Sequence, residues 1–226
     1  MFRAVIFDLD QTLIITLNRF YKVFNLMLVE FGGDEIDWDT FIKHYADDTL
    51  NVFIPKNVSI KTFWRTFLYR YNDVELEDEA PIPGAIDVLS RLKEMNIKIA
   101  VVTGRAVNEG YIWRELKRHG MADYVDCVVT SKDQDDGELF SKDEIFRKAA
   151  KCLGVPISKC IVVGDYWPDI KSGKAVNAKM VIGVLTGFMT RVQLEKYGAD
   201  VVIDSVADLL DVLSSYFVKD LTEGSF

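Results

Sequence analysis

Six short apolar runs, rich in β-branched residues, recur along the sequence and set the class of fold that it can adopt. They occupy residues 3–8, 98–103, 125–129, 160–165, 180–184 and 201–203. Runs that are this continuously apolar are expected in strands with both faces buried, as in a parallel sheet covered by helices. Longer segments with helical periodicity separate the runs, so the alternation predicts an α/β fold with a parallel sheet.

One long segment interrupts this alternation. It contains no predicted buried strand, but large apolar side chains recur in it at helical spacing. These side chains are Phe20, Phe24, Met27, Leu28, Phe31, Phe63, Phe67, Leu68 and Tyr71. An acidic run at 75–79, followed by two prolines and a glycine, marks the return of the chain to the sheet. We therefore predict an α/β core formed by residues 1–14 and 81–226, with residues 15–80 as a helical insert.

Charge and hydropathy exclude some classes of function. The net charge of −8 argues against nucleic acid as a partner, because a nucleic-acid-binding protein needs a basic face. A small anionic substrate is still compatible with this charge, since lysines, backbone amides and a cation can reverse the potential locally. No apolar run approaches the roughly 20 residues that span a bilayer, so no membrane partner is expected. The N-terminus reaches acidic residues too soon for a signal peptide, and we expect a cytoplasmic protein.

The sequence contains three cysteines, Cys127, Cys152 and Cys160. Their spacing does not match a metal site, and any disulfide scheme leaves one of them unpaired. We therefore predict three free thiols, as is usual in a reducing compartment.

Acidic and hydroxyl side chains stand where several of the apolar runs end. Asp8 and Asp10 close the first run and are followed by Thr12. Asp165 closes the fourth run, and Asp169 follows it. Because ligands bind at the carboxyl ends of the strands in open α/β sheets, we expect these acids to lie close together. Such acids would repel one another unless a hard cation joined them, and Mg²⁺ suits carboxylate oxygens.

Three motifs together identify a family. The pattern DxDxT at residues 8–12, the Thr-Gly pair at 103–104 and the pattern GDxxxD at 164–169 resemble the haloacid dehalogenase superfamily of hydrolases. The resemblance covers nearly the whole chain and is to the phosphoglycolate phosphatase-like branch. It implies a Rossmann-like parallel sheet core with a small helical cap domain inserted after the first strand. It also implies a phosphatase, since branches that displace halide lack an acid at the position of Asp10.

The resemblance implies a role for each acid. Asp8 would be the nucleophile that attacks phosphorus and forms an aspartyl-phosphate intermediate. Asp10 would protonate the leaving alkoxide and then activate water. Mg²⁺ would be held by Asp8, the backbone carbonyl of Asp10 and Asp165, with Asp169 supporting the site.

The resemblance also implies groups that bind the phosphate. Thr103 and the backbone amides of Leu9 and Gly104 would hold phosphoryl oxygens. In ungapped register, the lysine of the family falls two residues before Lys142, so the match is displaced here. We predict that Lys142 fills this place as a point charge between nucleophile and phosphate, with Lys132 as a poorer candidate.

Two residues depart from the usual pattern of this branch. Gln11 stands where the family usually has glycine, so it either crowds the turn or contacts substrate. Arg105 stands where asparagine is common. Arg105, Arg19 and Lys22 could each reach an anionic substrate, but we interpret them as solvated residues.

The remaining polar and aromatic side chains of note are interpreted as structural. His44 and His119 are single histidines on helical segments, and surface or packing roles without nearby partners are expected for them. Five aromatic residues are expected to pack the core of the helical insert rather than a substrate pocket: Phe20, Phe24, Trp38, Phe63 and Trp64.

The expected function is Mg²⁺-dependent hydrolysis of a small phosphorylated metabolite, a phosphate monoester of the phosphoglycolate or sugar-phosphate type. No residue selects between these substrates or indicates an oligomeric state. Two alternatives stay open: a sugar phosphomutase of the same superfamily, and a non-catalytic binding protein on this scaffold.

Overall fold

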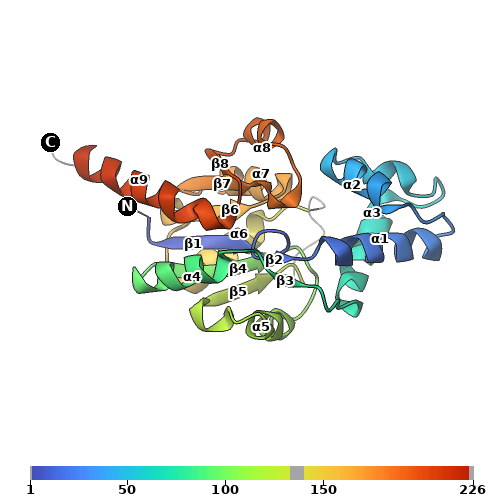
Figure 1. The fold of residues 1–226 in the computed structure, drawn as a ribbon, viewed down its shortest axis with the longest axis horizontal. Helices are drawn as coiled ribbons and strands as arrows, with labels where there is room; N and C mark the ends of the chain where they lie inside the picture. The colour runs from blue at the N-terminus through green and yellow to red at the C-terminus, as the bar shows by residue number, and fades with distance from the viewer. Residues whose placement is uncertain (1, 133–139, 224–226) are drawn as a thin grey trace.

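The computed structural model describes residues 2–132 and 140–223, with side chains as far as residue 216. A parallel six-stranded sheet runs through the centre of the molecule in the order β5-β4-β1-β6-β7-β8 (Figure 1). Its strands are β1 (Ala4–Asp8), β4 (Lys98–Thr103), β5 (Cys127–Thr130), β6 (Cys160–Gly164), β7 (Met180–Val184) and β8 (Val201–Ile203). Each of the six predicted runs forms one of these strands, with ends that differ by at most two residues. The predicted α/β class is confirmed.

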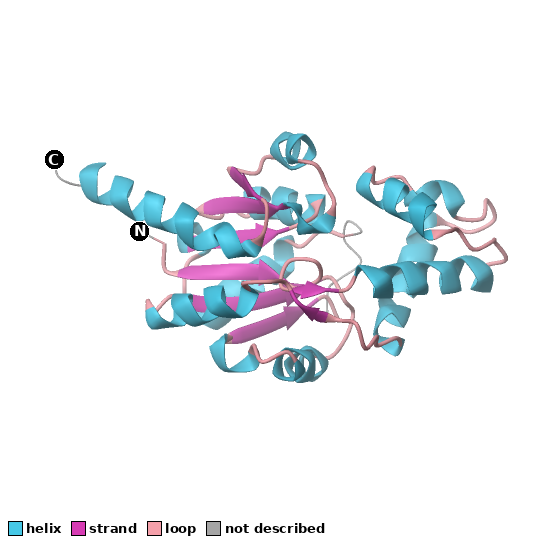
Figure 2. Cartoon of the chain, in the orientation of Figure 1, coloured by secondary structure: helices cyan, strands magenta, loops and turns pink. Residues whose placement is uncertain are grey.

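Helices cover both faces of the sheet (Figure 2). One face packs against α4 (Ala85–Glu94), α5 (Glu109–Arg118) and α9 (Leu209–Glu223), and the other packs against α6 (Asp143–Leu153), α7 (Trp167–Ala175) and α8 (Arg191–Tyr197). Side chains of β1 alternate between the two hydrophobic clusters: Val5 and Phe7 enter one, and Ala4 and Ile6 enter the other. Burial on both faces explains why the first four positions of β1 are all apolar rather than only every second one.

The chain leaves the sheet after β1 and forms a separate group of helices beyond the carboxyl ends of the strands (Figure 1). This helical segment, residues 17–73, contains α1 (Leu17–Glu30), α2 (Trp38–Ala46), η1 (Leu50–Phe53), α3 (Ile60–Arg70) and η2 (Tyr71–Asp73). Two short strands, β2 (Ile14–Ile15) and β3 (Ala80–Pro81), pair antiparallel where the chain crosses between the two parts. The division into a core of residues 1–14 and 81–226 and an insert of residues 15–80 stays a prediction. The remaining 3₁₀ turns are η3 (Ala122–Tyr124), η4 (Ile157–Lys159), η5 (Leu185–Gly187) and η6 (Val206–Asp208).

The helical segment has its own hydrophobic cluster. Phe24, Phe63 and Trp64 are buried in it, as expected from their spacing. Trp38 contacts Tyr21 but stays 37% exposed, so it packs at the edge rather than in the centre. None of the helices in the described residues is long and apolar enough to cross a membrane.

The prediction of three free thiols is wrong. Cys127 and Cys152 form a disulfide, and only Cys160 of the three is free. Cys127 is the first residue of β5, and Cys152 lies in the last turn of α6. Because α6 runs back along the sheet after β5, its end returns to the start of that strand. This proximity arises from the crossover of the chain, and the separation of 25 residues carries no sign of it.

We predict one reactive thiol in the denatured, unreduced protein and three after reduction, measured by thiol titration. Closing a loop of this length should stabilise the fold by about 3 kcal/mol, so reduction should lower the free energy of unfolding by that amount. Cys160→Ala is the matched control, because it should abolish the signal from the unreduced protein. Three reactive thiols without reductant would contradict the disulfide.

Candidate active site

Three aspartates converge where two neighbouring strands end. Asp8 is the last residue of β1, and Asp165 directly follows β6, which pairs with β1 in the sheet. Asp169 lies in the first turn of α7. Carboxylate oxygens of these three buried residues lie within 4.8 Å of one another. The fold therefore brings together the acids that the strand-end pattern singles out.

Two glycines make room for this cluster. A Cβ on Gly164 would lie 2.3 Å from Cβ of Asp169, and one on Gly187 would lie 1.8 Å from Oδ2 of Asp165. Neither distance is sterically possible, so both positions require glycine. Gly164 belongs to a motif that is visible in the sequence. Gly187 does not, because its importance depends on the approach of η5 to the end of β6.

Lys142 enters the cluster from the N-terminus of α6. Its Nζ lies 2.5 Å from Oδ1 of Asp8 and 2.7 Å from Oδ1 of Asp169. Phe140, where the family register places the lysine, has a left-handed backbone with φ of 71°. The backbone N–H of Lys142 donates to Oγ of Ser172 at 2.8 Å, which fixes the loop against α7. Lys132, the poorer candidate, is exposed at the edge of the cavity.

The electrostatics of the cluster call for more positive charge than Lys142 supplies. Burial raises the pKa of Asp8 to about 7, with Lys142 opposing the rise and Asp169 adding to it. Burial and the carboxylates of Asp8 and Asp169 also hold the pKa of Asp165 well above its usual range. Burial alone would lower the pKa of Lys142, but the two acids that it contacts raise it. Three carboxylates facing one ammonium leave two negative charges, which fits a divalent cation with a preference for oxygen ligands.

The side chain of Asp10 is turned away from this cluster toward Arg105. Arg105 donates from Nε at 2.9 Å and also from Nη2, and Thr16 Oγ1 donates at 2.8 Å. Thr103 Oγ1 lies 3.5 Å from the same carboxylate. Burial raises the pKa of Asp10, but the charge and hydrogen bonds of Arg105 outweigh it and the net pKa is lowered. Asp10 is therefore held in its ionised form.

Arg105 and Arg19 are both fully enclosed, so their interpretation as solvated residues is wrong. Their exposed fractions are 2% and 0%. Arg105 reaches Glu115 at 2.6 Å, and Arg19 pairs with Glu79 and also reaches Glu115 at 3.1 Å. Except for Glu115, which follows Arg105 by ten residues, the partners come from distant parts of the chain, so the burial has little local signal. Lys22 is exposed, as expected.

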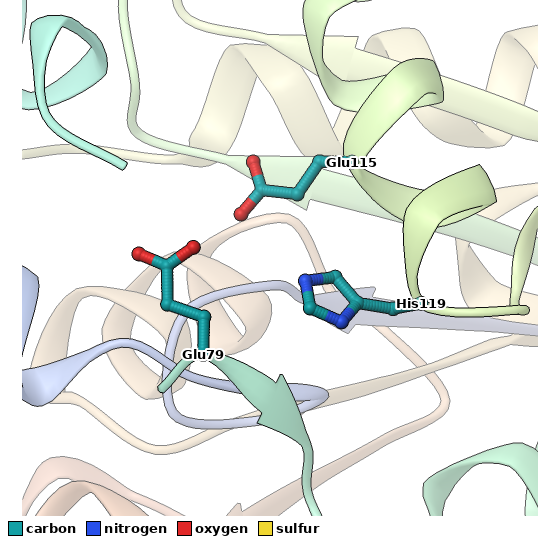
Figure 3. Close-up of side chains that lie close together, drawn as sticks. All are labelled: Glu79, Glu115 and His119. Carbon is teal, nitrogen blue, oxygen red and sulfur yellow. The ribbon is translucent and has the colours of Figure 1, made fainter. Parts of the chain in front are cut away.

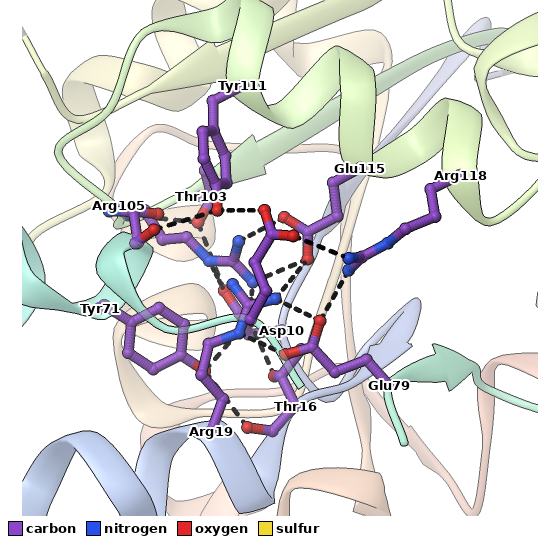
Figure 4. Close-up of polar contacts among 12 residues, drawn as sticks. Asp10, Thr16, Arg19, Tyr71, Glu79, Thr103, Arg105, Tyr111, Glu115 and Arg118 are labelled. Atoms are coloured by element: carbon purple, nitrogen blue, oxygen red, sulfur yellow. Dashed lines mark hydrogen bonds and ion pairs between the residues drawn. The ribbon is translucent and has the colours of Figure 1, made fainter. Parts of the chain in front are cut away.

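These side chains form one network that joins the helical segment to the sheet (Figure 4). It contains Asp10, Arg105, Glu115, Arg19, Glu79 and Arg118, linked in that order by ion pairs. The ring of Tyr71 lies 4.9 Å from the guanidinium of Arg105 and 5.3 Å from that of Arg19, as cation–π pairs. The network connects the carboxylate of Asp10 to the start of the helical segment.

Two members of this network, Glu79 and Glu115, form a second group of potential metal ligands with the nearby His119 (Figure 3). Both glutamates already accept hydrogen bonds from arginine side chains, so guanidinium groups supply the positive charge there. Nε2 of His119 is buried without a hydrogen-bond partner, and burial lowers the pKa of this ring. His44 was expected to lack a partner, but its Nδ1 lies 2.8 Å from Oγ1 of Thr49.

Gln11 occupies the turn after β1 in a left-handed conformation, with φ of 59°. Glycine adopts this conformation without strain, which explains its use at this position in the family. The side chain is buried, and its Nε2 has no hydrogen-bond partner. Of the two alternatives for Gln11, the structure favours crowding of the turn.

A cavity of about 410 Å³ opens between the helical segment and the carboxyl ends of the strands. Its lining includes six of the predicted site residues: Asp8, Asp10, Thr103, Gly104, Lys142 and Asp165. Leu9 and Asp169 lie behind this surface, fully buried. The pocket thus gathers a carboxylate nucleophile candidate, a lysine and a metal-ligand cluster in one open cavity.

Comparison with known proteins adds independent findings. A family model described as "Haloacid dehalogenase-like hydrolase" matches residues 5–183. A protein named pyrophosphatase PpaX from Anoxybacillus flavithermus is 28% identical over 93% of this chain and 96% of its own length. A PpaX relative from Clostridium perfringens is 32% identical over 94% of this chain and 98% of its own length. The crystal structure of a hydrolase from Pseudomonas syringae matches with a TM-score of 0.72 and 24% identity, covering 94% of this chain and 98% of the other.

The buried network generates a prediction about stability. Arg19→Met should leave Glu79 with only the half-exposed Arg118 and Glu115 with only Arg105, and lower the free energy of unfolding by about 3–5 kcal/mol in urea denaturation. Arg70→Met is the matched control, because Arg70 pairs with Glu30 on the surface and should matter far less. Equal effects of the two substitutions would show that the enclosed network does not stabilise the fold.

Proposed function

The chain belongs to the haloacid dehalogenase-like hydrolase family, and from this membership we propose that it is a Mg²⁺-dependent phosphatase that acts through an aspartyl-phosphate on Asp8. The observation that carries the proposal is the position of Asp8, which lines the cavity and contacts Lys142 beside Asp165 and Asp169. The names of the curated relatives, which describe pyrophosphatases, agree with phosphoryl transfer. The substrate would be a small phosphorylated metabolite in the cytoplasm.

The residues present fit a magnesium ion. The carboxylates of Asp8 and Asp165 and the backbone carbonyl of Asp10 would hold it, with Asp169 behind them. Asp169 is already engaged by Lys142 and by the backbone N–H of Tyr166, which suits a supporting role. When bound, the ion would offset the repulsion between the anionic nucleophile and the anionic phosphate.

The residues of this chain then act in two steps. An oxygen of Asp8 forms a bond to phosphorus while the bond between phosphorus and the alcohol oxygen breaks. Lys142 neutralises the phosphoryl oxygens, and Thr103 donates to them. The leaving oxygen takes a proton from Asp10. Water next attacks the aspartyl-phosphate and gives a proton to Asp10, so that phosphate leaves and Asp8 is restored.

The ion pair with Arg105 bears on the role of Asp10. An ionised Asp10 is ready to accept the proton of the attacking water. It must gain a proton before it can protonate a leaving group, and the approach of a phosphate dianion favours that change because like charges raise a carboxyl pKa. Arg105 therefore acts as the group that holds Asp10 in place between the two steps.

The first prediction from this proposal concerns the metal. Asp165→Ala should abolish hydrolysis of p-nitrophenyl phosphate or raise the Mg²⁺ concentration required by orders of magnitude, because a charged ligand is lost. Asp204→Ala, at an acid that is exposed on the surface, should behave like the wild type. Full activity of the wild type in EDTA would contradict the proposal that a metal ion is required.

The second prediction separates the two acids at the end of β1. Asp8→Asn should form no phosphoenzyme, since no anionic oxygen is left to attack phosphorus. Asp10→Asn should slow turnover by about 10²–10⁴-fold, most strongly for an alkyl phosphate and least for p-nitrophenyl phosphate, whose leaving group needs little protonation.

Rapid-quench trapping of labelled phosphate and peptide mapping provide the measurement. The label should map to Asp8 in the wild type and be absent from Asp8→Asn. Label on Asp10, or on no aspartate under single-turnover conditions, would mean that the mechanism is wrong.

A further inference from the structure

Beyond the catalytic acids, the lining of the cavity includes eight aromatic side chains. Phe20, Tyr45 and Trp64 contribute rings from the helical segment, so the expectation that Phe20 and Trp64 pack the core rather than a pocket is wrong for these two residues. Phe140 and Tyr166 contribute rings from loops of the core, and Trp167 contributes one from the start of α7. A substrate whose phosphate lies at Asp8 would place its alcohol part among these rings.

The rings are held in place by contacts that cross between the two parts of the molecule. Tyr45 and Tyr166 lie parallel, with an interplanar angle of 9° and centroids 6.0 Å apart. Trp64 meets Phe140 edge to face at 5.7 Å, and its Nε1 donates to Asn51 at 2.6 Å. Rings that are fixed before the ligand arrives lose little conformational entropy on binding, so the aromatic surface is preorganised.

The enclosed cations of the cavity are already engaged. Lys142 lies between Asp8 and Asp169, and Arg105 lies between Asp10 and Glu115. The other basic residues among the described lining are Lys61, Arg65 and Lys132, and all three are exposed. Water and salt screen the attraction of exposed cations for an anion.

A second phosphate or a carboxylate on the substrate would therefore find little stabilisation in the interior. Buried anions require a cation or several hydrogen-bond donors, and without them the desolvation of the charge opposes binding. The need for a cation or several donors applies to pyrophosphate, the substrate in the names of the relatives. It applies equally to small phosphorylated acids. An uncharged ring needs no such cation or hydrogen-bond donors.

We propose that the alcohol part of the substrate is an aromatic or heteroaromatic ring, and that phosphate monoesters of such alcohols are preferred over pyrophosphate and phosphorylated small acids. This inference rests on the proposed phosphatase function and names its substrate class. The cavity volume of about 410 Å³ is within the range of small-molecule sites and leaves room for a ring beside the phosphate. Stacked and edge-to-face ring contacts supply affinity beyond that of buried area alone.

The test compares phosphate esters of primary alcohols with similar leaving groups: benzyl, cyclohexylmethyl and ethyl phosphate. The value of kcat/KM for benzyl phosphate should exceed that for ethyl phosphate by about 10-fold or more, as expected for burying a ring in an apolar pocket. It should also exceed the value for cyclohexylmethyl phosphate, which has the same size without the π-system. Pyrophosphate and phosphoglycolate should be the poorest substrates. Equal or better turnover of either acid would overturn the inference and leave the phosphatase function standing.

Variants show whether the rings carry the preference. Trp64→Leu should reduce the ratio of benzyl to ethyl turnover, and Trp64→Phe, which keeps a ring, should retain most of it. Trp38→Leu is the matched control, because Trp38 lies in the same helical segment but outside the cavity lining. An unchanged ratio in a folded Trp64→Leu protein would contradict the assignment.

Binding without turnover separates this inference from the proposed function. Calorimetry with benzylphosphonate and ethylphosphonate should give about 10-fold tighter binding of the aromatic compound. That result in a protein that hydrolyses none of the esters would support the aromatic site and reject the phosphatase. Equal affinities would reject the aromatic site whatever the enzyme hydrolyses.

Discussion

The crowding of carboxylates at the ends of β1 and β6 is the constraint on which the candidate site depends. Adjacent parallel strands deliver Asp8 and Asp165 to the same edge of the sheet, and the first turn of α7 adds Asp169. Within the described residues, only Lys142 forms an ion pair with this group. Buried acids at such distances cannot all ionise without further positive charge, and a divalent cation would supply that charge. The glycines at 164 and 187 are further consequences of the same close approach.

A second charged group, built from arginines, governs the other acid of the site. Asp10 is bound by Arg105, and the carboxylate of Glu115 holds Arg105 and Arg19 together. Asp8 at the end of β1 and Asp10 just after it therefore face different surroundings although they are two residues apart. Burial, together with the neighbouring carboxylates, raises the pKa of Asp8, whereas the guanidinium of Arg105 outweighs burial and lowers the pKa of Asp10. Such a separation suits a nucleophile and a proton carrier that must act in turn.

Much of this arrangement could be predicted from the sequence, for identifiable reasons. The strands were predictable because burial on both faces leaves a continuous apolar run. The clustering of the acids was predictable because they stand where those runs end. Lys142 could be proposed from its charge, but only the left-handed turn at Phe140 explains how the chain delivers it. The assignment of catalytic roles stays a prediction.

Burial of charge and thiol pairing could not be predicted in the same way. Arg19 is stabilised by Glu79, 60 residues away, and by Glu115, 96 residues away, and neither spacing leaves a local pattern. Local composition marks an arginine on a helix as solvated because most are. The partner of Cys127 is likewise set by how α6 returns along the sheet.

The enclosed arginine network has a consequence for how this chain can change over generations. Loss of Arg19, Glu79, Glu115 or Arg105 on its own unbalances the enclosed charges, whereas apolar replacement of the whole group can leave the stability of the fold unchanged but removes the partner of Asp10. Evolution that replaces these residues one at a time therefore passes through poorly folded variants, so the four positions are expected to change together. Descendants should inherit the set intact or have exchanged it as a unit. The set formed by Arg105, Glu79, Glu115 and Arg19 is thus a lineage marker. It can be sought in other genomes without reference to substrate.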